Sequence, residues 1–298
     1  MEWEDREESQ NVEDDRDSGG GGFGGGGGFG GRRMVLGGGG IGSVIVIIIL
    51  ALVFGVDPRR FLGGGGQGVV ERPRQSSTDE EKERHFSAVI FGDTERIWDE
   101  QFRKMGKTYR KPTLHFYTNE VQSGCGFAEA SVGPFYCPAD EKVYLDLSFY
   151  QDMERKLNSP GEFARAYVIA HEVGHHVQKL LGYSVRVDDT RRRTGQESVE
   201  SHHMSVRLEL QADYFAGVWA HYGQEKYHFL RPGDIESALN AANEIGDDRL
   251  QKKARGTVRP DTFTHGRSDQ RVRWFNEGFK TGDIKGASRL FDLNYKEL

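Results

Sequence analysis

Cysteine is nearly absent from this 298-residue chain, and positive charge is not in excess. The net charge of −6 does not show the excess of positive charge that is typical of nucleic-acid-binding proteins, so we expect no nucleic-acid partner. No internal repeat is evident. The only cysteines, Cys125 and Cys137, have a spacing that suits one disulfide across a hairpin-like loop. Such a bridge would point to an oxidising compartment, and two free buried thiols are the alternative.

The N-terminal quarter differs in composition from the rest of the chain. Residues 1–18 carry nine acidic residues against two arginines, and glycine dominates the stretch that follows, so residues 1–33 are expected to be a disordered acidic and Gly-rich tail. Residues 34–56 contain no charge and are numerous enough to span a bilayer, which predicts one transmembrane helix. A Gly-rich linker over 57–70 would then lead to a single folded domain over 71–298.

The orientation of this predicted span stays open on charge alone. Two arginines precede it and four follow it closely, which by the positive-inside rule favours a cytoplasmic position for the domain over 71–298. A disulfide in the same domain would favour the opposite side of the membrane.

The HEVGH segment at residues 171–175 places two imidazoles and a carboxylate within one helical turn. At 100° per residue, His171 and His175 lie on one face about 40° apart, with Glu172 beside them. A zinc hydrolase needs this arrangement, because two imidazoles hold the ion and the carboxylate accepts a proton from its water. Apolar residues recur at helical spacing over 160–181, which supports a helix there. Two surface histidines on an amphipathic helix are the alternative.

A catalytic zinc site needs a third protein ligand. The metzincin pattern is absent, because Gln178 and Leu181 stand where that class has glycine and histidine. Glu209 and Asp213, four residues apart on a later predicted helix, offer carboxylates on one face. We predict that Glu209 binds the zinc and that Asp213 accepts the free N–H of a liganding histidine, with Glu200 as the reserve ligand. An ordinary charged helix face is the alternative.

Further candidates lie outside these two helices. His265 stands on a predicted turn before a helix and could donate to the oxyanion of a tetrahedral intermediate, so it joins Glu172 as a candidate catalytic residue. A structural histidine that orders the turn is the alternative. Arg271 and Arg273 could give electrostatic support, although salt bridges to acidic helix faces are favoured. His176 is expected to point away from the ligand pair.

The order of predicted elements places strands before helices, which favours an α+β fold with a small sheet packed on a mainly helical body. Helices are expected over 78–91, 94–105, 147–157, 160–181, 197–221, 234–253 and 268–279, and strands over 113–118, 134–137 and 143–146.

Four blocks of the chain resemble the bacterial neutral zinc metallopeptidase family: HEVGHHVQ, ELQADYFAG, and the runs over 233–251 and 263–279. The resemblance covers roughly residues 70–292 and extends to the Gly-rich N-terminus. It implies a zincin-like (gluzincin) catalytic domain with an HExxH…ExxxD core and one membrane segment. In gluzincin-like enzymes an edge strand holds extended substrate, and the resemblance gives that role to part of 121–137. Phe135 and Tyr136 are better explained as core residues.

The sequence therefore predicts a membrane-anchored zinc-dependent metallopeptidase that binds one zinc ion and cleaves a peptide or protein substrate. The resemblance favours the bacterial inner (cytoplasmic) membrane, with the catalytic domain extracytoplasmic. A zinc-stabilised membrane adaptor without turnover and a zinc hydrolase of a non-peptide substrate are the alternatives. The intact Glu172 argues against the adaptor, because zinc ligation does not require that residue.

Overall fold

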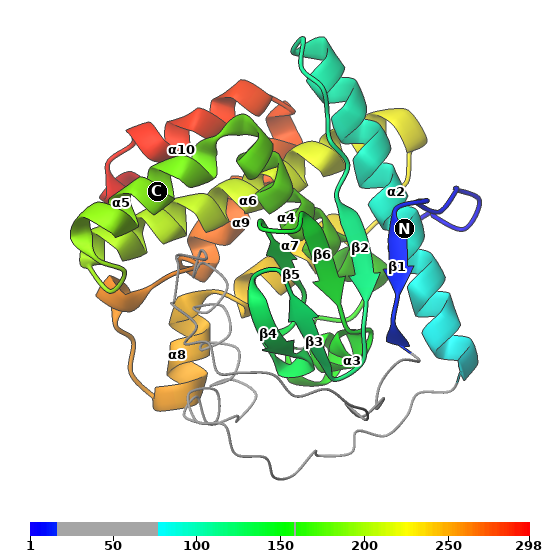
Figure 1. Cartoon of the computed structure of the whole chain (residues 1–298), viewed down its shortest axis with the longest axis horizontal. Helices are drawn as coiled ribbons and strands as arrows, with labels where there is room; N and C mark the ends of the chain where they lie inside the picture. The colour runs from blue at the N-terminus through cyan, green and yellow to red at the C-terminus, as the bar shows by residue number, and fades with distance from the viewer. Residues whose placement is uncertain (17–76, 158) are drawn as a thin grey trace, which may run out of the picture.

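The computed structural model describes residues 1–16, 77–157 and 159–298, which form a helical body with a small sheet (Figure 1). The strands are β1 (Val12–Asp14), β2 (Thr113–Phe116), β3 (Glu120–Ser123), β4 (Gly126–Glu129), β5 (Phe135–Cys137) and β6 (Lys142–Leu145). The helices are α2 (Ser77–Lys104), α3 (Ser148–Lys156), α4 (Glu162–Leu181), α5 (Tyr183–Thr194), α6 (Val199–Tyr227), α7 (Asp234–Glu244), α8 (Asp247–Arg255), α9 (Ser268–Thr281) and α10 (Arg289–Asp292). The expected combination of a mainly helical body and a small sheet is present.

The main sheet has the strand order β1-β2-β6-β5. Its first three strands are parallel, whereas β5 runs antiparallel to β6 and forms an edge of the sheet. β3 and β4 make a separate antiparallel hairpin. A disulfide between Cys125, in the turn of that hairpin, and Cys137 at the end of β5 joins the two sheets. The predicted disulfide is thereby confirmed.

Three helices at the centre of the body pack so closely that their backbones touch. A Cβ on Gly174 of α4 would lie 2.9 Å from the carbonyl oxygen of Ala212 on α6. A Cβ on Gly278 of α9 would lie 2.0 Å from the carbonyl oxygen of Tyr214, also on α6. Only glycine permits either approach, because any side chain would collide with the facing backbone. The positions of α4, α6 and α9 relative to one another are therefore tightly constrained.

The N-terminal segment is part of this fold, which corrects the expectation of a disordered tail for residues 1–16. β1 pairs with β2, and Figure 1 shows it alongside α2. Trp3 is 4% exposed, packs edge-on against Phe86 and donates from its indole nitrogen to Glu162 at 3.0 Å. The acidic side chains find cationic partners, as in the ion pair of Glu8 with Arg84. Composition shows the excess of acidic residues in this segment but not the cationic side chains, distant in the sequence, with which they pair.

Helix boundaries differ from the predicted ones at several places, including the end of α6, which continues to Tyr227 instead of residue 221. α2 is one continuous helix instead of two. Gly92, inside this helix, allows residues 7–9 to cross close to the α2 backbone, since a Cβ on Gly92 would lie 2.9 Å from the backbone nitrogen of Ser9. The helix expected over 234–253 is two helices, α7 and α8, separated at Gly246. α5 was not predicted, because its sequence is strongly polar and shows little periodicity.

The predicted transmembrane helix and inner-membrane localisation are corrected as well. Within the described residues, no helix has both the length and the apolar character needed to cross a bilayer. The segments over 34–56 and 57–70 lie outside the described residues. Residues 1–16 nevertheless pack on the body formed by the later chain, whereas a single crossing between them would put the two on opposite sides of a membrane. The prediction of a single-pass inner-membrane protein is therefore wrong.

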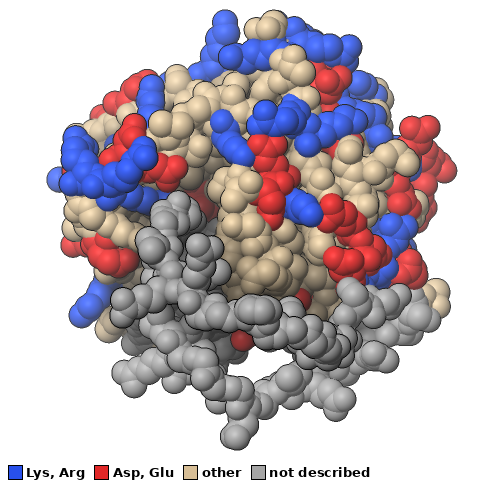
Figure 2. All heavy atoms as spheres, viewed as in Figure 1, with Lys and Arg blue, Asp and Glu red and all other residues tan. Residues whose placement is uncertain are grey.

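Charged side chains of both signs share the face seen in Figure 2. Lysine and arginine gather over α5, whose last turn contains Arg191, Arg192 and Arg193, and acidic side chains gather toward β1 and α2. Many of these groups are paired, including Arg192 with Asp189 at 2.5 Å.

Candidate metal centre

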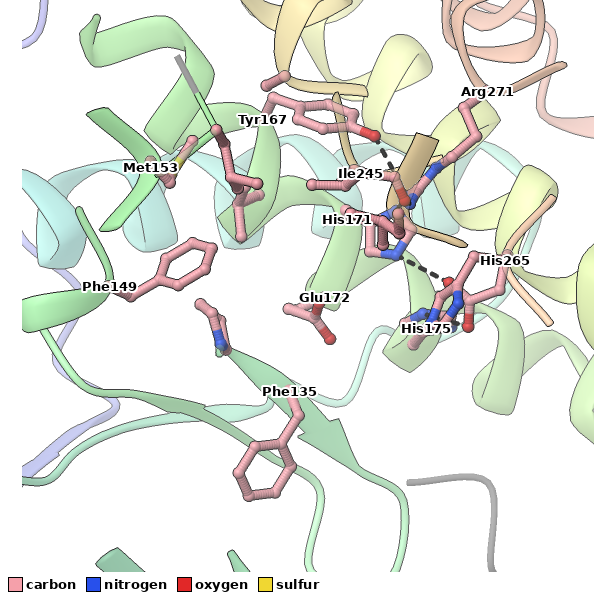
Figure 3. Close-up of a pocket in the computed structure, with 16 residues that line it drawn as sticks. Phe135, Phe149, Met153, Tyr167, His171, Glu172, His175, Ile245, His265 and Arg271 are labelled. Carbon is pink, nitrogen blue, oxygen red and sulfur yellow. Dashed lines mark hydrogen bonds and ion pairs between the residues drawn. The ribbon is translucent and has the colours of Figure 1, made fainter. Parts of the chain in front are cut away.

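Two helices bring three potential metal ligands together. His171 and His175 extend from α4 and Glu209 extends from α6, and their ligand atoms all lie within 4.8 Å of one another. The Nε2 atom of His171 is 3.3 Å from one carboxylate oxygen of Glu209, and the Nε2 atom of His175 is 3.5 Å from the other. Figure 3 shows these histidines at one end of a cavity that Glu172 and His265 also line.

Two separations between these side chains are close to those of a tetrahedral zinc site, although they involve different oxygens of Glu209. Ligand atoms about 2.0–2.1 Å from a tetrahedral ion are roughly 3.4 Å apart, which matches the two nitrogen–oxygen separations. Two imidazoles and one carboxylate are also a donor set that catalytic zinc sites use, with the fourth position left for water or substrate. The described residues could therefore hold one zinc ion.

The three side chains form a charge-coupled cluster. Burial alone would lower the pKa of His171, but the adjacent Asp213 carboxylate outweighs it and raises that pKa to about 10. Burial would raise the pKa of Glu209, but the imidazoles of His175 and His171 hold it well below its usual value. A metal ion entering this cluster must displace a proton from His171, because only the neutral imidazole is a ligand.

Asp213 connects His171 to a buried network behind the cluster. Its Oδ1 atom lies 2.8 Å from His171 Nδ1 and accepts a hydrogen bond from the Tyr167 hydroxyl at 2.5 Å. The Arg271 guanidinium donates to both oxygens of the same carboxylate, at 2.8 and 2.9 Å. Asp213 is completely buried and Arg271 is 2% exposed, so each charge depends on the other. The network fixes the orientation of the His171 ring.

His175 is oriented by a separate contact. Its Nδ1 atom lies 2.8 Å from the Gln178 side-chain oxygen, one turn further along α4. The amide nitrogen of Gln178 in turn donates to the backbone carbonyl of Leu208, next to Glu209. Gln178 thereby links the two ligand-bearing helices directly beside the cluster.

Glu172 lies next to the three ligands, and within the described part of the chain it forms no hydrogen bond or ion pair with them. Its carboxylate accepts a hydrogen bond of 2.9 Å from the backbone nitrogen of Tyr136 on the edge strand β5. Burial raises the pKa of Glu172 above its ordinary value. A carboxylate held in this way is a stronger base than an exposed one, as proton transfer from water near neutral pH requires.

His265 reaches the same cavity from the turn before α9. The Nδ1 atom of His265 lies 3.2 Å from Asp247, whose other oxygen accepts from the backbone nitrogens of Thr264, His265 and Gly266 at 2.7, 2.6 and 3.0 Å. Gly266 adopts a left-handed φ of +94°, which favours glycine at this turn. The turn is consequently anchored to the start of α8.

The remaining candidates from the sequence lie away from the cluster. Glu200 is exposed and pairs with Arg193. Arg273 donates to backbone oxygens at the end of the chain, in contrast to Arg271. His176 is buried on the far side of α4, where its ring nitrogens contact the Tyr136 hydroxyl and the Arg110 carbonyl, and burial lowers its pKa to about 4.

Four contributors to the site were not identified from the sequence. Gln178 stands three residues after His175 on the same helix, a spacing that weakly indicates contact between the two side chains. Tyr167 stands one turn before His171 and looked like a core residue. Asp247 lies within a stretch for which the sequence predicts one long helix. Its contacts with the His265 turn depend on the break of that helix at Gly246. The Tyr136 contact uses a backbone nitrogen, for which a sequence holds no signal.

The fold and this centre define a mainly helical protein with a His–His–Glu cluster suited to one metal ion. The chain belongs to the family described as "putative neutral zinc metallopeptidase", whose model matches residues 1–289 and so includes the N-terminal segment.

Two relatives illustrate the range of similarity. The uncharacterized protein YpfJ of Escherichia coli strain K12 is 49% identical over 283 residues, which cover 95% of this chain and 96% of that protein. The uncharacterized protein Rv2575 of Mycobacterium tuberculosis strain H37Rv is 44% identical over 185 residues, or 59% of this chain and 61% of that protein. No solved structure matches the chain.

Proposed function

We propose that this protein is a zinc-dependent peptidase that hydrolyses peptide bonds with an activated water. The observation that carries the proposal is the position of Glu172, a buried carboxylate beside three ligand side chains yet outside their contacts. Family membership supports zinc and hydrolysis at the level of class. His171, His175 and Glu209 are the proposed ligands, and Asp213 holds the His171 ring in place.

Zinc bound there would polarise the substrate carbonyl and lower the pKa of the attacking water toward about 7. Glu172 accepts the proton of that water and then passes it to the nitrogen of the leaving amine. The hydrogen bond from the Tyr136 backbone keeps the carboxylate aimed at the cavity between these events. His265, anchored by Asp247, donates to the oxyanion of the tetrahedral intermediate.

The edge strand favours a peptide over other substrates of the same water chemistry. Among the described strands β5 pairs only with β6, so it is an edge strand, and its Tyr136 backbone nitrogen meets Glu172 at that edge. An extended peptide can add to such an edge through backbone hydrogen bonds. A non-peptide substrate would make no use of this edge.

The test is metal analysis of the purified protein, combined with cleavage of casein and of a peptide library. One zinc per chain is expected, with cleavage that stops after chelation and returns when zinc is added. One zinc without cleavage of any peptide would favour the zinc-stabilised adaptor, and hydrolysis confined to non-peptide esters or amides would favour the second alternative.

A further inference from the structure

A large polar cavity lies beside the metal-binding cluster. Its volume is about 430 Å³, and the end of α4, the helix α5 and part of α6 supply most of its walls. Two of the three proposed ligands line both this cavity and the one that Glu172 lines, whereas Glu172 itself does not line the polar cavity. Residues 134–135 at the start of β5 line the cavity of Glu172, and Tyr136 and Pro138 line the polar one. A chain extended along the edge strand would therefore pass from one cavity to the other.

The acyl half of a peptide substrate, which carries the attacked carbonyl, is the half that would enter the polar cavity. This step rests on the proposed function, in which Glu172 passes a proton to the nitrogen of the leaving amine. The amine half must then lie beside Glu172. The acyl half extends in the opposite direction along β5, toward Tyr136 and Pro138. The lining of the polar cavity therefore bears on the residues before the cleaved bond.

Arg191, in the last turn of α5, is a cation of this cavity with few partners of its own. Its Nη2 atom donates to the Ser205 hydroxyl on α6 at 2.9 Å. Its Nη1 atom lies 3.8 Å from the Asp188 carboxylate, which is beyond hydrogen-bond distance, and its buried Nε atom has no hydrogen-bond partner among the described residues. Lys179, which also lines the cavity, is engaged with Glu141 at 2.6 Å.

The positive charge of Arg191 is incompletely balanced by its surroundings. Burial lowers the pKa of Arg191 from its ordinary value, and the carboxylates of Asp188 and Glu209 only partly offset that effect. The Asp188 side chain is 53% exposed, so solvent weakens its attraction for the guanidinium. A carboxylate brought into the cavity could form charge-assisted hydrogen bonds with the guanidinium, which are stronger than those to a neutral group.

We infer that Arg191 selects substrates with an acidic side chain, aspartate or glutamate, at one of the two positions before the cleaved bond. An extended chain advances about 3.3 Å per residue, so both positions stay close to the cluster that borders the cavity. A lysine or arginine there would meet a like charge, and glutamine would lose the charge-assisted contact. Figure 2 shows lysine and arginine gathered over α5, which favours the approach of an acidic chain.

The chain offers a matched control one residue further along α5. Arg192 pairs with Asp189 at the same three-residue spacing at which Arg191 faces Asp188. The Arg192 and Asp189 side chains are 73% and 63% exposed, and neither lines either cavity. Arg192→Met and Asp189→Asn therefore repeat Arg191→Met and Asp188→Asn outside the cavity.

The first measurement is kinetic and uses zinc-loaded protein with peptides that differ only at the two positions before the cleaved bond. At one of them, glutamate should exceed glutamine in kcat/KM by about 10-fold or more. Arg191→Met should remove this preference, and Asp188→Asn should increase it because a competing carboxylate is gone. Both control variants should keep the wild-type preference. If Arg191→Met does not fold, Asp188→Asn decides, and a preference that it leaves unchanged would overturn the inference.

A binding measurement separates this inference from the peptidase proposal. N-acetyl-glutamyl-alanine and N-acetyl-alanyl-glutamate resemble acyl-side products, and calorimetry can compare each with its glutamine counterpart without any turnover. One of the glutamate ligands should bind about 10-fold more tightly to the wild type and to Arg192→Met, but not to Arg191→Met. This difference without cleavage of any peptide would defeat the proposed function alone. Equal binding within both pairs, or a difference that persists in Arg191→Met, would overturn the role of Arg191.

Discussion

Asp247 holds His265 twice, once through the side chain and once through the backbone. One carboxylate oxygen lies 3.2 Å from His265 Nδ1, and the other accepts from the His265 backbone nitrogen at 2.6 Å. The two residues are 18 positions apart, and the intervening chain includes α8. The carboxylate therefore fixes both the place of the turn and the direction of the imidazole.

His265→Ala should lower kcat by about 10²–10³ with little change in KM, because one preorganised oxyanion donor contributes about that much. Zinc stoichiometry and the melting temperature should stay close to those of the wild type, since the Asp247 bonds to the turn backbone remain. Kinetics and metal analysis on one preparation check both points. Loss of zinc would make His265 a ligand, and an unchanged kcat would leave it a structural residue.

Asp247→Asn tests the contact between Asp247 and His265 through the pH dependence of kcat/KM. Burial would lower the pKa of His265, but the Asp247 charge outweighs it and raises that pKa. If His265 acts in its protonated form, activity persists below that raised pKa and is lost as pH rises through it. The neutral amide should let the pKa fall, so the alkaline limb of the kcat/KM profile should move to lower pH. An alkaline limb at the same pH as in the wild type would exclude a catalytic role for the protonated form of His265.

Glu209 and Asp213 should affect zinc binding to different degrees. Glu209→Ala removes a proposed ligand, so zinc binding should be lost at micromolar concentrations of the metal. Asp213→Asn removes the charged partner of both His171 and Arg271 but no ligand, so affinity should fall about 10–100-fold. Competition with a chromophoric chelator measures both. Glu200→Ala serves as the control, because Glu200 lies outside the cluster. Equal and negligible effects of the first two variants would remove α6 from the site.

Trp3→Ala should destabilise the whole domain. The indole is nearly fully buried, and replacement of such a side chain by alanine costs about 3–5 kcal/mol. The free energy of unfolding from urea titration is the measurement, with the exposed Glu4→Ala as the control. A Trp3→Ala protein as stable as the control would mean that the N-terminal segment contributes nothing to the fold.

The sequence could predict those parts of the site that depend on local spacing. His171, Glu172 and His175 lie within one turn of a helix, and Glu209 and Asp213 lie one turn apart on another, so periodicity alone groups each set. That α4 and α6 meet through Gly174 and Ala212 is a tertiary contact. The small residues on α6 suggested a close approach, but only the structure shows which atoms touch.

Other parts could not be predicted, because their signals are distant or belong to the backbone. Trp3 finds its partners more than 80 residues away, so an acidic composition was taken as a sign of disorder. The cavity that Glu172 lines takes apolar side chains from α3, α4, α7 and α8, which are far apart in the sequence, so no local pattern marks them as neighbours. The hydrogen bond from the Tyr136 backbone to Glu172 depends on the register of β5 and β6.

The central claim is that Glu172 is the base and not a ligand, and Glu172→Gln tests it most directly. The amide has nearly the same volume and can still accept the hydrogen bond from the Tyr136 backbone, so the fold should be retained. The measurement is zinc content and peptide turnover on the same sample. We expect one zinc per chain and a nearly complete loss of turnover. A variant without zinc, or one with zinc that still cleaves peptides at the wild-type rate, would contradict it.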